Sequence, residues 1–191
     1  MFTEADIRKL QCKYFGERYR GASLAKIELP NASAMELNTW KQEPHNALVV
    51  LGPAGTGKTY LCSAMLEEIP VLYRSFRIHN ERELLERLRQ GIQSGQGDYL
   101  ANLHYLIDDD FLILDDIGSA GKAKNNEWRE EILTETIDFR YKQKLPTIYT
   151  SNLTKKEFQA IYHPRVCSRL FATENCIVDF FGLPDLREQG L

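Results

Sequence analysis

The residues of this chain with the most specific chemistry lie in one short glycine-rich stretch. Gly52, Gly57, Lys58 and Thr59 have the spacing G-x-x-x-x-G-K-[ST], which is the pattern of a phosphate-binding loop. The glycines let backbone N–H groups turn inward around phosphates, while Lys58 pairs with the β- and γ-phosphates and the Thr59 hydroxyl holds Mg²⁺. The alternative is a chance match in a glycine-rich turn. The predicted nucleotide-binding residues are Gly52, Pro53, Ala54, Gly55, Thr56, Gly57, Lys58, Thr59 and Tyr60.

Two adjacent carboxylates, Asp115 and Asp116, follow the apolar run 111–114. A continuous apolar run bounded by turn residues is typical of a strand that is buried on both faces. Because open α/β sheets bind ligands at the carboxyl ends of their strands, we expect both acids in the ligand crevice. Asp115 would share Mg²⁺ with Thr59, and Asp116 would orient or deprotonate the attacking water. The alternative is that the acids only cap the strand and keep its end solvated.

Asn152 and an arginine pair are weaker candidates for the same chemistry. Asn152 ends a strand predicted at 146–152, and it reaches the γ-phosphate only if this strand lies beside the one that carries Asp115. Otherwise Asn152 caps the next helix. Arg165 and Arg169 are four residues apart and share a helix face, which suits a phosphate bound to a neighbouring molecule. Surface salt bridges are the alternative for the arginines.

Strands and helices must position these motifs. We expect strands at 47–51, 71–77, 111–116, 146–152 and 176–181. We expect helices at 3–20, 32–42, 81–90, 98–107, 127–142 and 155–161, one directly after the phosphate loop, and a short one opened by Pro164. Thr3 and Asn80 are predicted N-caps. The phosphate loop therefore lies between a strand and a helix, as the motif requires.

The densest group of basic residues lies in and around the predicted helix 81–90. It indicates either a nucleic-acid contact or a solvated face of mixed charge, because Glu81, Glu83 and Glu86 alternate with the arginines. The basic residues of this group are Arg74, Arg77, His79, Arg82, Arg87 and Arg89.

The composition is that of an ordinary globular domain. The chain has 191 residues, 43% hydrophobic and 27% charged, which is enough for one domain with its own core. The net charge of -3 gives no global field for nucleic acid, so such a contact depends on a local patch. The sequence lacks a membrane-spanning run and a signal peptide, so we expect a cytoplasmic protein without a membrane role. Four scattered cysteines without a C-x-x-C pair argue against a zinc site or a disulfide framework.

The N-terminal segment is open to two interpretations. Ile7, Leu10 and Tyr14 fall on one face of the helix predicted at 3–20. This face either packs on the main domain or docks a partner protein. Further along, Tyr19 and Leu24 are candidates for contact with an adenine ring, or plain core residues.

The order of these motifs resembles the AAA+ ATPases and, more narrowly, the DnaC/DnaI helicase loaders and their IstB-like transposition relatives. The resemblance extends from about residue 18 to residue 187, which is nearly the whole chain. It rests on an ordered series of stretches that match the pattern of this family. These are 18–24, 52–59, 84–89, 112–118, 137–141, 145–148, 150–153 and 165–170.

The resemblance implies a three-layer α/β fold of the P-loop NTPase type, with a central parallel five-stranded sheet in the order 5-1-4-3-2. It also implies Asn152 as sensor 1, an arginine finger at Arg165 or Arg169, and binding of ssDNA around 81–90. Asp116 departs from the AAA+ pattern, which usually has Glu there, and the shorter acid suits slow hydrolysis. We expect no C-terminal lid domain and divide the chain into a short N-terminal helix at 1–20, available for partner docking, and an AAA+ ATPase domain at 21–191. This is a minimal version, of phage or bacterial plasmid type.

The expected function is that of an ATP-dependent helicase loader in the initiation of DNA replication. Such a protein binds ATP with Mg²⁺, binds ssDNA, self-associates in the ATP state and delivers a replicative hexameric helicase. Its ATP hydrolysis is expected to be slow and stimulated by assembly. The alternatives are an IstB-like ATPase that selects target DNA for a transposase, and a non-motor module that occupies the helicase. A P-loop kinase has the least support, because the sequence shows no evident substrate pocket or lid.

Overall fold

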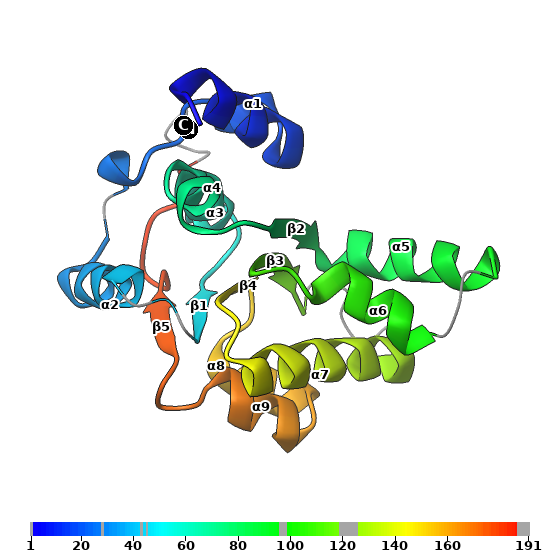
Figure 1. Ribbon diagram of the computed structural model, residues 1–191. Helices are drawn as coiled ribbons and strands as arrows, with labels where there is room; N and C mark the ends of the chain where they lie inside the picture. The colour runs from blue at the N-terminus through cyan, green and yellow to red at the C-terminus, as the bar shows by residue number, and fades with distance from the viewer. Residues whose placement is uncertain are drawn as a thin grey trace.

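A parallel five-stranded sheet forms the centre of the molecule (Figure 1). The computed structural model describes residues 2–27, 29–42, 44, 46–95, 99–118 and 126–186. Neighbouring strands pair in parallel in the order β2-β3-β4-β1-β5, which confirms the expected topology. The strands are β1 (Ala47–Leu51), β2 (Phe76–Asn80), β3 (Phe111–Ile117), β4 (Thr147–Ser151) and β5 (Cys176–Asp179).

Helices cover both faces of the sheet, which gives the three layers that were expected (Figure 1). One layer is α5 (Glu81–Gln93), α6 (Tyr99–Ile107), α7 (Asn126–Gln143), α8 (Lys155–Ile161) and α9 (Pro164–Leu170). The other is α1 (Glu4–Phe15), α2 (Asn31–Gln42), α3 (Lys58–Ala64) and α4 (Ile69–Leu72), with the short 3-10 turns η1 (Glu17–Tyr19), η2 (Leu24–Lys26) and η3 (Met65–Glu67). Within the described ranges, no helix is both long enough and apolar enough to cross a bilayer.

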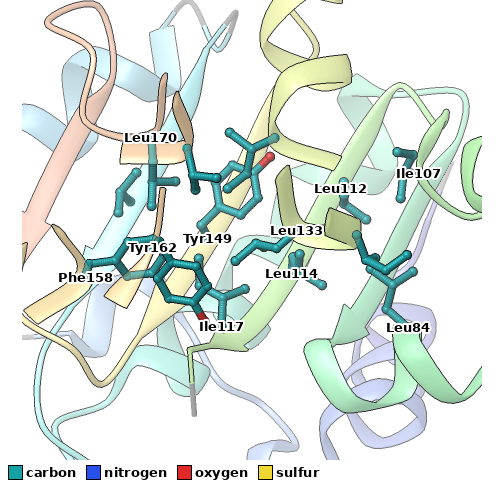
Figure 2. Close-up of a cluster of buried hydrophobic side chains, with 14 of the residues drawn as sticks. Leu84, Ile107, Leu112, Leu114, Ile117, Leu133, Tyr149, Phe158, Tyr162 and Leu170 are labelled. Carbon is teal, nitrogen blue, oxygen red and sulfur yellow. The ribbon is translucent and has the colours of Figure 1, made fainter. Parts of the chain in front are cut away.

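Each face of the sheet carries its own hydrophobic core. Successive side chains of a strand point to opposite faces, so a strand that is covered on both sides is apolar throughout. On β1, Val49 and Leu51 belong to the core under α5–α9, whereas Leu48 and Val50 belong to the core on the other face. Figure 2 shows part of the first core, to which strands and helices contribute Leu84, Ile107, Leu112, Leu114, Leu133, Tyr149, Phe158 and Leu170.

The prediction of the second strand at 71–77 was wrong in its first half. Residues 69–72 form the helix α4, where Pro70 lies in the first turn and its fixed φ suits a helix start. Strand β2 begins only at Phe76, which pairs with Phe111 of β3, and it continues to Asn80. A short apolar run is consistent with either a helix or a strand, and at 71–73 the β-prone residue types favoured the wrong one.

Other element ends differ from the predictions by a few residues. Helix α1 ends at Phe15 because Gly16 has a φ of +95°, a conformation that favours glycine and stops the helix. Helix α5 continues through Gly91 to Gln93, beyond the predicted end at residue 90. Residues 96–98, which include the first residue of the helix predicted at 98–107, lie outside the described residues. Strand β5 ends at Asp179 rather than at residue 181.

Helix α1 packs on the same face of the sheet as α3, the helix that follows the phosphate loop. Its apolar face, with Ile7, Leu10 and Tyr14, packs against the second core. The buried Gln11 side chain donates to the Ala22 carbonyl at 2.7 Å and accepts from the Gly21 amide at 2.7 Å. These bonds hold the chain that follows α1 in a defined position.

The buried His79 of β2 predicts a pH-dependent stability. Burial lowers the pKa of its imidazole to about 4; the charge of Glu83 opposes this effect, and the charges of Arg87 and Arg77 add to it. Because this pKa is below that of the unfolded state, protonation favours unfolding, and stability is lost as the pH falls from about 6.5 toward 4. We expect protonation of this residue to lower the free energy of unfolding by about 1–2 kcal/mol as the pH falls from 7 to 5. Urea unfolding of His79→Leu at several pH values in this range should show an unfolding free energy that depends less on pH than that of the wild type. An unchanged pH dependence would contradict the role of His79.

Candidate nucleotide-binding site

A cleft of about 1160 Å³ lies at the carboxyl end of the sheet. A cleft of this size accommodates a nucleotide. It is lined by the phosphate loop, by the ends of β2, β3 and β4, and by residues of the segments 18–27 and 183–186. The lining residues used below are Tyr19, Ile27, Lys58, Thr59, Asn80, Glu81, Asp115, Asp116, Thr150, Asn152, Leu183, Pro184 and Leu186.

The phosphate loop has the backbone that its glycines permit. Gly55 and Gly57 have φ values of +85° and +100°, and α3 begins directly afterwards at Lys58. The Lys58 ammonium donates to the carbonyls of Gly52 at 2.7 Å and Pro53 at 2.6 Å, so it is held inside the loop. A cation inside a loop of inward-turned amides is the arrangement that binds phosphates.

A C-terminal segment lies over this loop. The Leu186 amide donates to the Gly55 carbonyl at 3.0 Å. The Asp185 carboxylate lies so close to Gly55 that a Cβ at this glycine would collide with it. The neighbouring Leu183, Pro184 and Leu186 line the cleft as apolar walls.

The Asp115 carboxylate joins three elements of the site. Its Oδ2 accepts from the Thr59 hydroxyl of α3 at 3.0 Å, and its Oδ1 accepts from the Thr150 hydroxyl of β4 at 2.5 Å. Burial raises the pKa of Asp115, while the two hydroxyl bonds act in the opposite direction. A hydroxyl and a carboxylate in contact at the mouth of a phosphate loop are a hard-oxygen ligand set that suits Mg²⁺. The structure therefore brings into contact the two residues that the sequence analysis assigns to one Mg²⁺.

Asp116 adopts a backbone conformation that is unusual for a residue with a side chain. Its φ is 60°, in the left-handed region, and such conformations cluster at functional sites. Its amide donates to the Thr150 hydroxyl at 2.8 Å, and its Oδ1 accepts from the Asn152 side-chain amide at 2.8 Å. Strand β4 thus lies beside β3, and Asn152 reaches the crevice that holds both acids.

Tyr19 and Tyr60 also line the cleft. Tyr19 lines the cleft, whereas Leu24 packs into the second core, so only the first of the two adenine candidates reaches the site. The Tyr60 hydroxyl accepts from the Ser23 amide at 3.2 Å and joins α3 to the segment 18–27. Ile27, Leu183, Pro184 and Leu186 line the same cleft, so apolar side chains are available there to contact a flat ring.

Arg165 and Arg169 lie outside this cleft, as judged from the described residues that line it. Both form ion pairs with Asp138 of α7, to which Lys142 also donates at 2.8 Å. Burial alone raises the pKa of Asp138, but the bonds with Lys142 and Arg165 and the charge of Arg169 hold it below its ordinary value. The Arg165 side chain is 50% exposed and that of Arg169 is 25% exposed, so the first is the more accessible.

The arginines of the basic group are largely matched with acids. Arg82 pairs with Glu86 at 2.9 Å and Arg87 pairs with Glu83 at 2.8 Å, both along α5. Arg89 lies over the Trp128 ring at 4.8 Å. The group is therefore closer to the mixed-charge face that was the alternative than to a continuous basic patch. His79, which is buried, contributes nothing to such a surface.

Thr150, Asn80 and Glu81 are site residues that the sequence analysis missed. Thr150 precedes Asn152 by two residues and so shares its face of the strand, a signal that was available. Asn80, predicted only as a helix cap, does cap α5 and also lies opposite Asp115 in the strand register. Glu81 was grouped with the solvated charges, but it is buried. The segment 183–186 has no motif that predicts its place over the phosphate loop.

Comparison with known proteins gives consistent matches. A family model described as IstB-like ATP binding protein matches residues 28–170. The insertion sequence IS1162 putative ATP-binding protein of Pseudomonas fluorescens is 37% identical over 138 residues, which are 72% of this chain and 55% of that protein. The replicative helicase loader DnaC of Escherichia coli (strain K12) is 23% identical over 124 residues, 65% of this chain and 49% of that protein. The chain thus spans about half the length of these relatives.

Solved structures show the same fold. The crystal structure of the DnaC helicase loader superposes with a TM-score of 0.67 at 21% sequence identity, and the match covers 85% of this chain and 99% of that chain. The strand order and the helices on both sides of the sheet agree with an AAA+ fold.

The contact between Asp185 and Gly55 predicts coupled stabilities. Gly55→Ala should cost about 1 kcal/mol for its left-handed backbone and about 1 kcal/mol more for the collision with Asp185. When Asp185→Ala is combined with Gly55→Ala, only the cost of the collision should disappear. Gly95→Ala is the control, because Gly95 also has a positive φ but no atom of the described residues lies within 4 Å of the added methyl. Urea unfolding measures the stability of the three single variants and of the double variant Gly55→Ala with Asp185→Ala. If Gly55→Ala has the same cost with and without Asp185, the segment 183–186 does not lie over the phosphate loop.

Proposed function

The chain belongs to the family of IstB-like ATP binding proteins, and from this premise we propose that it is an ATP-dependent helicase loader in the initiation of DNA replication. The observation that carries the ATP-driven part is the set of contacts from Thr59 and Thr150 to Asp115 and from Asn152 to Asp116. The loader part is supported by the relative named replicative helicase loader.

The residues of the cleft fit Mg·ATP. Lys58 exchanges the carbonyls of Gly52 and Pro53 for the β- and γ-phosphates, which are stronger acceptors because they are charged. Thr59 and Asp115 hold the metal through the oxygens that now face each other. A Mg²⁺ ion held by these residues would supply positive charge beside the phosphates. Tyr19 and the apolar residues Leu183, Pro184 and Leu186 of the cleft would contact the base.

Asp116 and Asn152 act on the attacking water. The Asp116 carboxylate accepts a proton from the water or orients it, and Asn152 holds that carboxylate by its amide. Asn152 is also placed to sense the γ-phosphate. If the γ-phosphate replaces Asp116 as the hydrogen-bond partner of the Asn152 amide, the Asn152 side chain changes its position. The short aspartate side chain favours slow turnover, as in a switch.

A second copy of the chain supplies the arginine. Arg165 and Arg169 do not line the described part of their own cleft, so either one stabilises the transition state only from a neighbouring molecule. Asp138 keeps both arginines on one surface of α9 until that neighbour is present. An interface that joins two different surfaces is heterologous and propagates into a ring or a spiral. Bound ATP thus favours assembly of the copies, and ATP hydrolysis lets them dissociate.

Helix α5 is the proposed contact for ssDNA. Its arginines are exposed beside carboxylates, with the Arg82 side chain 88% exposed. Phosphates compete with Glu83 and Glu86 for these guanidinium groups, so that binding is weak and strongly dependent on salt. This suits a protein that transfers its helicase to DNA and then leaves.

A transposition helper ATPase is the second candidate. It is favoured by the 37% identity with an insertion-sequence protein, which is higher than the identity with the loader. The same cleft and the same arginines serve both functions, so the partner protein decides between them.

The arginine pair predicts an ATPase rate that depends on protein concentration. The wild-type specific activity should rise with concentration as the shared site forms. Arg165→Ala with Arg169→Ala should lower the rate by at least about 100-fold while the affinity for ATP stays within about threefold, because an arginine finger acts only in the transition state. Steady-state phosphate release and titration with a fluorescent ATP analogue measure the two quantities.

Lys142→Ala is the matched control for this double variant. Lys142 also pairs with Asp138 but its side chain is 60% exposed and it lies on α7, so its loss should leave the rate near that of the wild type. Normal hydrolysis by the double arginine variant would contradict the shared site. The single variants assign the finger to Arg165 or to Arg169.

The partner is expected to be a hexameric DNA helicase. With ATP present, the tagged chain purified from its native host should bring down this helicase, and ssDNA with ATP hydrolysis should release it. Mass spectrometry of the bound fraction identifies the partner. Recovery of a transposase in place of the helicase would favour the second candidate.

A further inference from the structure

Glu81, the first residue of α5, is a buried carboxylate in the nucleotide cleft. Its side chain is only 5% exposed, and it lies between α5 and α7. The guanidinium of Arg129 pairs with both of its oxygens, with the Nε–Oε1 bond at 2.6 Å. The Arg129 side chain is 8% exposed. A buried pair in this two-bond geometry is a fixed structural point, unlike the exposed pairs further along α5.

The same carboxylate anchors the backbone that follows the hydrolytic acid. Its Oε2 accepts from the Gly118 amide at 2.9 Å, and this bond is buried. Gly118 has a φ of +84°, and a Cβ there would meet the Leu153 side chain at 2.7 Å, so the turn is tightly confined. The Gly118 amide lies two residues after Asp116.

Asp116 is therefore held from two sides. Its own amide is bound by Thr150 of β4, and the turn after it is bound by Glu81 of α5. Its left-handed φ is a strained conformation that persists only where the surroundings determine it. If the anchor at Gly118 is removed, the backbone at Asp116 is free to relax and its carboxylate moves away from the water.

Arg129 holds this anchor in place through both carboxylate oxygens. Burial alone lowers the pKa of Arg129, but the bond and charge of Glu81 outweigh it, with a contribution from Asp116. The two-bond pair holds the Glu81 carboxylate in one orientation, with its Oε2 within hydrogen-bond distance of the Gly118 amide. The ion pair therefore serves the bond to Gly118.

We propose that Glu81 is a positioning residue for Asp116 in ATP hydrolysis, acting through the Gly118 amide and held by Arg129. The proposal rests on the proposed ATPase function. Glu81 does not touch the nucleotide phosphates in this role. Its contribution is to the rate of the chemical step rather than to the affinity for ATP.

Two double variants test the proposal without leaving a buried charge unpaired. Glu81→Gln with Arg129→Met keeps a neutral acceptor for the Gly118 amide. Glu81→Leu with Arg129→Met removes the acceptor and fills the space with apolar groups. The two proteins differ only at the side chain that faces Gly118, and thermal unfolding checks that both are folded. Glu83→Gln, which breaks the exposed pair with Arg87 on the same helix, is the control.

The Leu/Met protein should have a kcat about 10- to 100-fold below that of the Gln/Met protein, because a small misplacement of a catalytic group has an effect of this size. Its affinity for ATP should differ by less than about threefold. Hydrogen exchange at the Gly118 amide should be faster in the Leu/Met protein alone. All rates are measured at one protein concentration without DNA, where the control should match the wild type.

Equal kcat values for the two double variants, in a background where the wild type is active, would overturn the positioning role alone. A parallel loss of ATP affinity and kcat in the Leu/Met protein would also overturn it, because that result means general damage to the cleft. A wild-type chain without ATPase activity would overturn the proposed function together with this inference.

Discussion

The site depends on one carboxylate that is bound by two hydroxyl groups. Asp115 of β3 accepts from Thr59, which follows β1 through the phosphate loop, and from Thr150 of β4. The three strands can meet in this way only because β4 lies between β1 and β3 and all of them run in the same direction. Both faces of this sheet are sealed by apolar layers, so the polar groups have only its carboxyl edge on which to gather. The topology of the sheet is thus the cause of the site.

Peripheral segments complete the cleft around this centre. Gln11 of α1 ties down the chain at Gly21 and Ala22, and the segment 183–186 closes over Gly55. Neither segment brings the arginines of α9 to the phosphates, because Asp138 of α7 holds them elsewhere. A cleft that is lined by its own acids but not, among the described residues, by Arg165 or Arg169 explains why self-association and hydrolysis are linked in our account.

Residues with a local pattern were predictable from the sequence, and residues placed by packing were not. The phosphate loop, Asp115 and Asp116 follow apolar strands, and the structure places them together around one cleft. The strand at 71–77 was misplaced because a short apolar run does not distinguish helix from strand. Glu81 looked like one charge among many on α5, and only its contact with Arg129 of α7, 48 positions away, buries it. Asp185 has no pattern at all, since its position depends on how the chain returns after β5.

The central claim is that one active site is built from two copies of the chain. The most direct test mixes two inactive variants, Lys58→Ala, which lacks the phosphate-binding ammonium, and the chain without Arg165 and Arg169. In the mixture, the first variant offers its arginines to the intact phosphate loop of the second. Our account predicts that each variant alone hydrolyses ATP at background rate and that the mixture recovers a substantial fraction of the wild-type rate. A mixture that remains as inactive as its components would contradict the shared site.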